Sequence, residues 1–222
     1  FLEIEKLKVS SFKKKLALLL FEKKNLNNCD CLVACSNQEA IALRNFGLSQ
    51  PIVILPNGVH NSIIRKGVLV SNDLTFKLKH GINKSSKILL FLSRVHPFKG
   101  LKLLLESILI IREEFRKNDW IFIIAGPDEL NHTKELSLFV EKNNINDIVR
   151  FIGPQYNNDK IAAFDSANCF ILPSKGENFG IAVIEALARG LPVITTKNTP
   201  WSELKDNSCG WCVNRNKNEF IN

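Results

Sequence analysis

Apolar runs alternate with amphipathic segments along the second half of the chain. Five runs have the length of buried strands, at 87–93, 120–126, 148–153, 169–173 and 192–196. The segments between them repeat their apolar positions with helical spacing, at 100–117, 134–144, 158–167 and 179–190. This alternation predicts an α/β fold with a doubly wound parallel sheet, in which ligands bind beyond the carboxyl ends of the strands.

The N-terminal part of the chain has a different texture and predicts a second, smaller unit. Its expected elements are a basic amphipathic helix at 11–24, a strand at 30–36, a helix at 37–47 and a strand at 51–58. Because so short a piece cannot form a self-sufficient α/β domain, we expect a fragment in which both lobes are incomplete. The expected regions are the remnant of an N-terminal lobe at 1–56, an inter-lobe linker at 57–86 and a larger C-terminal lobe at 87–222.

The composition fits a folded protein with an excess of positive charge. Hydrophobic residues make up 45% of the chain, which excludes wholesale disorder. The apolar runs, such as 16–21, are far shorter than the roughly 18–20 residues that cross a bilayer. A net charge of +8 favours anionic partners such as nucleic acid, acidic membrane or phosphorylated small molecules, although a lysine-rich solvated surface also explains it. The basic helix at 11–24 either touches acidic membrane or a lipid-linked acceptor, or packs on the rest of its lobe.

Cysteines cluster near the two ends of the chain, at Cys29, Cys31 and Cys35 and at Cys209 and Cys212, with Cys169 between them. The CxxC spacing of the second group suits redox chemistry or zinc, and with the CxC pair it could build a four-thiolate site. No histidine lies near the CxxC in the sequence, and a thiol in an apolar run acts as a small hydrophobe. We therefore expect reduced thiols in a cytoplasmic protein.

Residues suited to binding phosphate follow the predicted strands. Arg94 and Lys99 come after the strand at 87–93, and Gly176 and Gly180 precede the helix at 179–190. Guanidinium and ammonium groups suit phosphate oxygens, and a helix N-terminus binds anions. These features should converge on a diphosphate at the carboxyl edge of the sheet. The alternative for the two cations is an ordinary solvent-exposed loop.

Two carboxylates flank the start of the same helix. Glu177 precedes it, and Glu185 lies two turns inside it among apolar neighbours. A carboxylate on the sheet-facing side of a helix needs a partner, and sugar hydroxyls are donors of the right kind. The alternative is that Glu185 simply points to water. A nucleoside diphosphate sugar offers hydroxyls at both ends with the diphosphate between them.

Three segments together resemble the C-terminal lobe of the GT-B glycosyltransferases, in the retaining group called family 4. They are SRVHPFKG, GENFGIAVIEALARG with its E-x7-E spacing, and GLPVITT. The likeness spans about residues 55–213, and AGPDE, TPWSEL and CGWCV resemble a branch that assembles polysaccharide or lipopolysaccharide. The resemblance implies two Rossmann-like lobes, of which the C-terminal one binds a nucleotide-sugar.

The same resemblance implies a role for each candidate residue. Arg94 and Lys99 would bind the donor diphosphate and act with Glu177, which would bind the donor sugar, in catalysis. Glu185 would bind the ribose. Further donor contacts are implied for Asn178, Phe179 and Gly180 at the helix start and for Phe151, Ile152 and Gly153 beside the base.

The implied reaction moves a sugar from a UDP- or GDP-sugar to an acceptor glycan or lipid-linked saccharide, with retention of configuration. Fixed cations and helix N–H groups would stabilise the charge that develops on the departing diphosphate. The sequence has no D-x-D triplet, so we expect neither a metal nor another cofactor. Nucleic acid is not an expected partner. We expect the fragment to bind donor, whether or not it catalyses transfer alone.

Other functions of an α/β lobe fit the residues less well. A dinucleotide-dependent oxidoreductase requires G-x-G-x-x-G after a strand, where this chain has SRVHPFKG. A nucleotide-sugar epimerase or a phosphorylase of the same fold remains open. A non-catalytic basic module would have no need of Glu177 and Glu185, and its binding would weaken steeply with salt.

Overall fold

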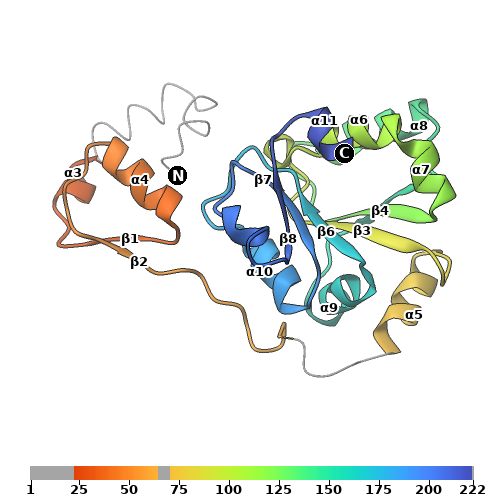
Figure 1. Ribbon diagram of the computed structural model, residues 1–222, viewed down its shortest axis with the longest axis horizontal. Helices are drawn as coiled ribbons and strands as arrows, with labels where there is room; N and C mark the ends of the chain where they lie inside the picture. Colours follow the sequence, from red (N-terminus) through yellow and green to blue (C-terminus); the bar gives the residue numbers. More distant parts are fainter. Residues whose placement is uncertain (1–22, 65–70, 222) are drawn as a thin grey trace.

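The structure is a computed structural model that describes residues 23–64 and 71–221. These residues form a two-stranded and a six-stranded sheet, both parallel (Figure 1). The predicted α/β class with a parallel sheet is confirmed. The predicted helix at 11–24 lies almost entirely outside the described residues, which begin with the short helix α3 (Lys23–Asn27).

The six-stranded sheet forms the centre of the larger lobe, and its strand order is β5-β4-β3-β6-β7-β8. Counted from β3, this is the 3-2-1-4-5-6 order of Rossmann folds, in which the winding reverses between β3 and β6. A ligand site is expected beyond the carboxyl ends of these two strands. The strands are β3 (Lys87–Leu92), β4 (Trp120–Ala125), β5 (Val149–Gly153), β6 (Cys169–Leu172), β7 (Val193–Thr196) and β8 (Gly210–Val213).

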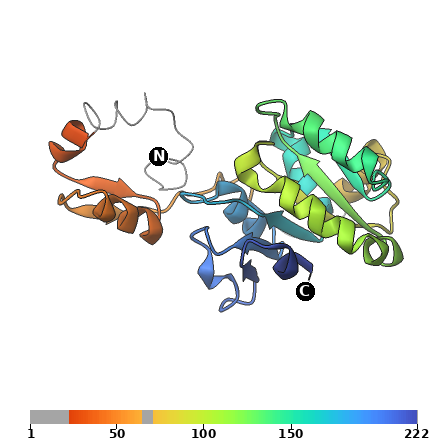
Figure 2. The same ribbon diagram turned by 90° about the horizontal axis from the view of Figure 1, so that it is seen from above.

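Helices cover both faces of the six-stranded sheet (Figures 1 and 2). One face is covered by α6 (Leu101–Ile110), α7 (Arg112–Lys117), α8 (His132–Lys142) and α11 (Lys217–Ile221). The other face is covered by α5 (Ser71–Lys79), α9 (Asn157–Ser166) and α10 (Ile181–Ala188). Helix α10 ends in a Schellman motif at Gly190, whose φ is +79° and whose N–H donates to Leu187 C=O at 2.9 Å. Gly190 was the predicted C-cap.

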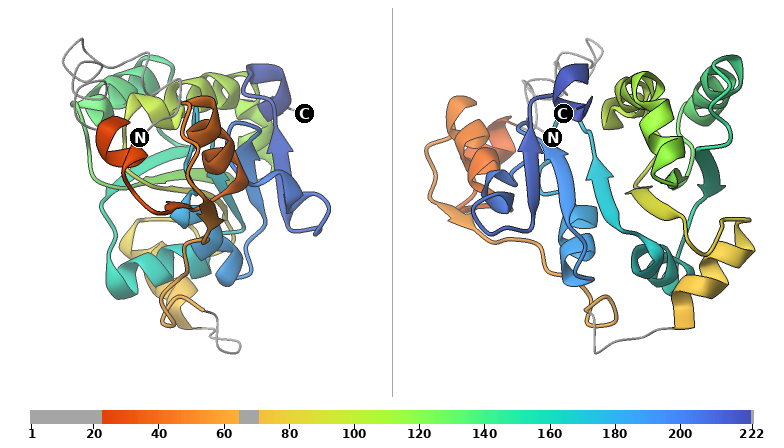
Figure 3. Two further views of the ribbon diagram at one scale, coloured as in Figure 1. Left: turned by 90° about the vertical axis from the view of Figure 1, so that its left-hand side faces the viewer. Right: turned by 45° about the vertical axis from the view of Figure 1, so that its right-hand side comes forward.

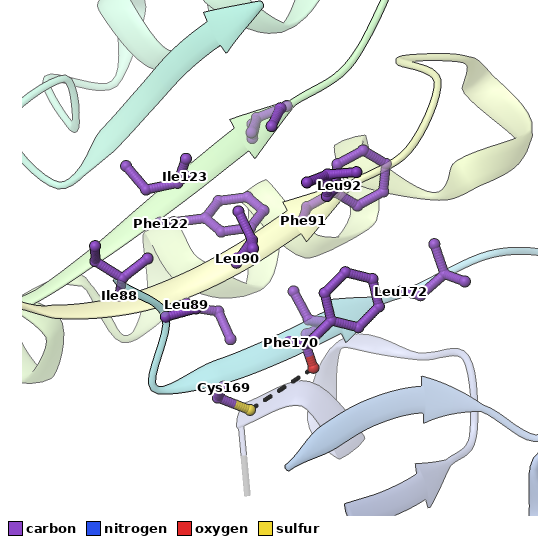
Figure 4. Close-up of a cluster of buried hydrophobic side chains, with 14 of the residues drawn as sticks. Ile88, Leu89, Leu90, Phe91, Leu92, Phe122, Ile123, Cys169, Phe170 and Leu172 are labelled. Atoms are coloured by element: carbon purple, nitrogen blue, oxygen red, sulfur yellow. Dashed lines mark hydrogen bonds between the residues drawn. The ribbon is translucent and has the colours of Figure 1, made fainter. Parts of the chain in front are cut away.

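The core of the larger lobe lies where the central strands meet the helices. All of β6 and all of β3 except its first residue are buried, because helices cover both faces of these strands. This explains why the strand sequences are continuous apolar runs rather than alternating ones. Phe91, Phe122 and Phe170 are fully buried there on three adjacent strands (Figure 4). Cys169 lies in the same core, and burial raises the pKa of its thiol to about 12, as expected of a small hydrophobe.

The small unit consists of β1 (Leu32–Ala34), α4 (Asn37–Asn45) and β2 (Ile52–Ile54), as the pattern predicts. Leu32, Ala34, Leu43 and Leu48 form its buried core. Ser36 is the N-cap of α4 and accepts a hydrogen bond from the Glu39 N–H at 3.2 Å. This small unit lies beside the carboxyl ends of β6 and β7 of the larger lobe (Figures 1 and 3).

Three parts of the structure differ from the sequence-based expectation. Helix α5 lies in the segment 57–86, which was expected to be a linker, and Phe76 and Ile82 from this segment join the core of the larger lobe. Strand β8 was not predicted, because it has only four residues and two of them, Gly210 and Cys212, add little to an apolar pattern. The helix predicted at 100–117 is two helices that meet at Ile111. One turn before the break, the Ser107 hydroxyl donates to the Leu103 carbonyl at 3.0 Å, a side-chain hydrogen bond of the kind that bends helices.

The described residues offer neither a membrane-spanning helix nor a metal cluster. No described helix is long and apolar enough to cross a bilayer. Within the same ranges, no three His, Cys, Asp or Glu side chains lie close enough together to hold a metal ion. All six cysteines are free thiols, including Cys209 and Cys212.

Candidate functional site

The turn at 97–100, called the β3 turn below because it follows that strand, places Lys99 at the carboxyl edge of the sheet. Pro97, Phe98 and Lys99 form a 3-10 turn whose N-cap is His96, and His96 Nδ1 accepts a hydrogen bond from the Phe98 N–H at 3.0 Å. Gly100 ends the turn with a φ of +78°, and a Cβ added there would lie 2.0 Å from the Pro173 carbonyl oxygen. Only glycine therefore lets this turn approach the end of β6.

The loop from Ser174 to Gly180, called the 174–180 loop below, follows β6 and leads into α10. Its backbone is held from several sides: the Lys175 N–H donates to Phe98 C=O at 2.9 Å, and the Thr196 hydroxyl donates to Ser174 C=O at 2.7 Å. The Trp201 indole N–H donates to Phe179 C=O at 2.5 Å. Gly180 closes the loop with a φ of +81° and is the N-cap of α10. The predicted loop and helix start are therefore held rigidly against the β3 turn.

Lys99 and Glu177 form an ion pair at the centre of this arrangement. Lys99 Nζ donates to Glu177 Oε1 at 2.5 Å, and the Ser174 hydroxyl donates to the same oxygen at 2.5 Å. The two charged side chains are only 10% and 12% exposed, so the pair is largely desolvated and each charge depends on the other. The second oxygen, Oε2, has no hydrogen-bond partner among the residues that the structure describes.

A cavity of about 310 Å³ opens at this ion pair. Because helices leave their first N–H groups without partners inside the helix, the start of α10 gives this cavity a positive end. Ser93 and Asn57 also face the cavity, although the sequence pattern did not single out either residue. Its described lining is Asn57, Ser93, Lys99, Leu172, Glu177, Asn178, Phe179, Gly180, Ile181 and Ala182. The structure thus brings together five predicted site residues: Lys99, Glu177, Asn178, Phe179 and Gly180.

Arg94 is not among the described residues that line this cavity. Its guanidinium lies between the β3 turn and the loop after β4, and Nη1 donates to both carboxylate oxygens of Glu129 at 2.9 and 3.0 Å. The Arg94 side chain is 60% exposed, so this pair is weak and the guanidinium is free to turn. Its role toward a diphosphate stays a prediction.

Glu185 is buried, and its partner is a lysine. Lys160 Nζ, from α9, donates to Glu185 Oε1 at 2.5 Å. The expectation that this carboxylate needs a partner is met within the protein, and the alternative in which Glu185 simply points to water is not what the structure shows. Glu185 Oε2 has no hydrogen-bond partner in the described part of the chain. Lys160 escaped the sequence analysis because a lysine in the first turn of an amphipathic helix is ordinarily solvated.

The remaining predicted residues lie on the edge strand β5. Phe151 and Ile152 are half-buried and pack against the main core, and Gly153 has a φ of +70° at the end of the strand. None of the three is among the described residues that line the cavity at Lys99. Their predicted contact with a nucleotide base stays a prediction.

His96, in the segment that leads to Lys99, has a shifted pKa. Burial lowers its pKa below the ordinary 6.5, and this outweighs the opposing attraction of Glu129. A neutral His96 keeps Nδ1 free to accept the Phe98 N–H, and this hydrogen bond supports the turn that holds Lys99.

Comparison with known proteins adds to this geometry. The chain is 29% identical over 188 residues to a D-inositol 3-phosphate glycosyltransferase of Catenulispora acidiphila, covering 82% of this chain and 43% of that protein. It is 30% identical over 125 residues to a D-inositol 3-phosphate glycosyltransferase of Corynebacterium glutamicum, covering 53% of this chain and 28% of that protein. The chain thus spans less than half the length of these curated relatives.

Two solved structures share the fold. WaaG, a glycosyltransferase involved in lipopolysaccharide biosynthesis, superposes with a TM-score of 0.78 at 18% identity, over 96% of this chain and 60% of that one. HepE of Anabaena, solved with UDP and glucose, gives a TM-score of 0.79 at 18% identity, over 99% of this chain and 57% of that one. These likenesses establish a GT-B type of α/β fold. Residues 72–222 match the family described as glycosyl transferases group 1, and the chain belongs to that family.

Proposed function

We propose that this chain supplies the donor-binding part of an enzyme that transfers a sugar from a nucleoside diphosphate sugar to an acceptor. The observation on which this rests is the cavity at the start of α10, where a nearly buried Lys99–Glu177 pair faces the helix N-terminus. This combination places a cation and helix N–H groups where a diphosphate would fit. The Oε2 atom of Glu177, without a partner among the described residues, would accept hydrogen bonds from the sugar.

The same residues account for bond cleavage. As the bond between the anomeric carbon and the diphosphate oxygen breaks, negative charge grows on the leaving group and positive charge on the sugar. Lys99 and the N-terminus of α10 would stabilise the first, and the Glu177 carboxylate would stabilise the second. Arg94 would join Lys99 on the diphosphate after leaving Glu129, an exposed partner that it can exchange at little cost. Because Lys99 and Arg94 would carry the charge of the diphosphate, we propose that no metal ion is obligatory.

The nucleoside would lie on the side of α10 that carries Glu185. Glu185 Oε2, which has no partner within the described ranges, would accept a hydrogen bond from a ribose hydroxyl, while Glu185 Oε1 keeps its bond from Lys160. Phe151, Ile152 and Gly153 would contact the base. UDP-sugars are the first donors to test, because HepE is solved with UDP and with UDP-glucose, and GDP-sugars are the alternative.

The finer parts of the proposal concern the acceptor and the stereochemistry. We propose a glycan or lipid-linked acceptor and retention of configuration, as the resemblance to family 4 implies. The likeness to WaaG, which is involved in lipopolysaccharide biosynthesis, supports an acceptor of this class. The relatives named for D-inositol 3-phosphate make a small phosphorylated acceptor the second one to test. We further propose a cytoplasmic enzyme whose basic segment 11–24, of which only 23 and 24 belong to the described residues, contacts acidic membrane; packing of this segment on its own lobe is the alternative.

A screen of nucleotides tests the proposed function. Thermal unfolding of the full-length protein should shift upward with UDP or GDP and with their sugars, because a ligand at about 100 times its Kd adds roughly 2.7 kcal/mol to the stability of the folded state. Glu185→Ala should reduce the shift from the free nucleotide. With a donor identified, Glu177→Ala should lower transfer on the order of 100-fold or more.

The same screen separates the alternatives. No shift with any nucleoside diphosphate would refute a donor site. Conversion of donor to an isomer without acceptor, or cleavage that depends on phosphate, would identify an epimerase or a phosphorylase instead. Binding that ignores the Glu177 and Glu185 substitutions and falls steeply with salt would indicate a basic anion-binding module.

A further inference from the structure

The N-terminus of α4 contacts the 174–180 loop through two residues. The Ser36 hydroxyl donates to the Asn178 carbonyl at 2.8 Å, and the Asn178 amide Nδ2 donates to Glu39 Oε1 at 2.9 Å. One residue of the loop is therefore held at both its backbone and its side chain by the small unit. Nearby, Gln38 Nε2 donates to the Thr199 carbonyl at 3.1 Å. The junction between the two units thus forms directly on the loop that carries Glu177.

The two contacting side chains are themselves fixed by local structure. Ser36 is 8% exposed, and its hydroxyl accepts the Glu39 N–H at 3.2 Å. The other Glu39 oxygen, Oε2, accepts both the backbone N–H and the thiol of Cys35 at 2.8 Å each. Serine at the N-cap and glutamate three positions later resemble a capping box, in which each residue orients the other. Neither side chain can move without loss of hydrogen bonds inside the small unit.

The loop side of this contact lies at the candidate site. Asn178 lines the 310 Å³ cavity and adjoins Glu177, whose carboxylate accepts from Lys99 and Ser174. Movement of the Asn178 backbone would therefore move the carboxylate beside it. Small misplacements of a binding group cost much of its effect, because the interaction depends on reaching the ligand at hydrogen-bond distance.

We propose that Ser36 and Glu39 are positioning residues that hold the 174–180 loop in the conformation that binds donor. This rests on the proposed function, since it assigns the loop to a donor site. The binding energy of the nucleotide is then not spent on ordering the loop, because the small unit has already ordered it. The role belongs to residues of the small unit, which are outside the range 72–222 that matches the family.

Exchanging the donor and the acceptor of the hydrogen bond between Asn178 and Glu39 tests this role in the full-length protein. Asn178→Asp places two carboxylates against each other, and we expect UDP binding to weaken by about tenfold or more. Adding Glu39→Gln should restore it, because the new amide donates to the new carboxylate while its oxygen still accepts the Cys35 N–H. Asn143→Asp, which makes the same change at the C-cap of α8, where the amide also donates to an oxygen and none of the described cavity residues lies, is the matched control and should leave binding unchanged.

Hydrogen–deuterium exchange of the 174–180 amides without nucleotide gives a second measurement. Exchange should be faster in Asn178→Asp than in wild type and should slow again in the double variant. Ser36→Gly, which keeps most of the cap but loses the hydroxyl, should change binding and exchange in the same direction by less. Ser36→Gly keeps the test decisive if Asn178→Asp does not fold.

Each result decides the proposal. Weakened UDP binding without restoration by Glu39→Gln would show that Asn178 acts on the nucleotide itself and would overturn the positioning role. Unchanged exchange in Asn178→Asp and Ser36→Gly would overturn it as well. If wild type binds no nucleoside diphosphate, the proposed function fails, while exchange that follows the predicted order would still support control of the loop by Ser36 and Glu39.

Discussion

At the residue scale, the site depends on charges that are nearly removed from water. Lys99 and Glu177 are each about nine-tenths buried, and such a pair persists only where further hydrogen bonds satisfy both charges. Ser174 satisfies Glu177 Oε1 on the protein side, and Glu177 itself lines the cavity. A buried pair that borders a cavity is more costly than a surface pair and therefore suits function better than stability.

His96 links the pH of the solution to the turn that holds Lys99. Because burial lowers its pKa in the folded state, the unfolded chain binds the proton more readily. The resulting contribution to stability is full above the ordinary pKa of 6.5 and is lost as the pH falls below it. His96→Asn keeps an acceptor for the Phe98 N–H but cannot titrate, so the free energy of unfolding should depend less on pH between pH 7 and about 5.

Urea unfolding at several pH values measures this effect. The His96→Asn variant still contains a second histidine with a lowered pKa, His80, so part of the pH dependence should remain after the substitution. His80→Asn is the comparison that reports the remaining part. Identical slopes for His96→Asn and wild type would contradict the contribution assigned to His96.

At the scale of elements, the site is assembled by close approach of two turns. Gly100 at the end of the β3 turn lies against Pro173 at the end of β6, and this contact spans the switch point of the sheet. The 3-10 turn on one side and the 174–180 loop on the other then bring Lys99 and Glu177 together. Neither turn could reach the other with a larger residue at position 100.

Gly100→Ala tests this approach. A left-handed φ alone costs an alanine roughly 1–2 kcal/mol, and here the added Cβ would also meet the Pro173 carbonyl oxygen at 2.0 Å. We expect Gly100→Ala to lower the free energy of unfolding by clearly more than the roughly 1–2 kcal/mol that the left-handed φ alone costs. Gly81→Ala is the matched control, because its φ is +62° with no atom within 4 Å of the added Cβ. Equal losses in the two variants would contradict the close approach.

The elements that could be predicted are those whose sequences carry a strong apolar signal. β3, β4 and β6 are buried on both faces, so continuous runs such as 87–93 identify them. Helix α5 is largely polar; it is held because its Phe76 joins the core and because it packs against α9, and local sequence patterns do not show such tertiary contacts. Lys160 and Glu129 were missed for a similar reason: both become partners only through contacts between segments far apart in the chain.

At the scale of the whole molecule, the candidate site lies where the two units meet. The larger lobe contributes the ion pair and the helix N-terminus, and the segment that leaves the small unit contributes Asn57 to the cavity lining. The 174–180 loop is held on one side by Thr196 and Trp201 and on the other by Ser36 and Glu39. The site therefore faces the junction between the larger lobe and the small unit.

Calorimetric titration of the full-length protein with UDP tests the central claim that a nucleoside diphosphate binds at Lys99 beside the start of α10. Lys99→Ala should weaken UDP binding on the order of 100-fold, because the buried cation facing the diphosphate is lost. Lys102→Ala removes an exposed lysine of α6 that pairs with Glu135, and it should bind UDP like wild type. Equal affinity of wild type and Lys99→Ala for UDP would contradict the account.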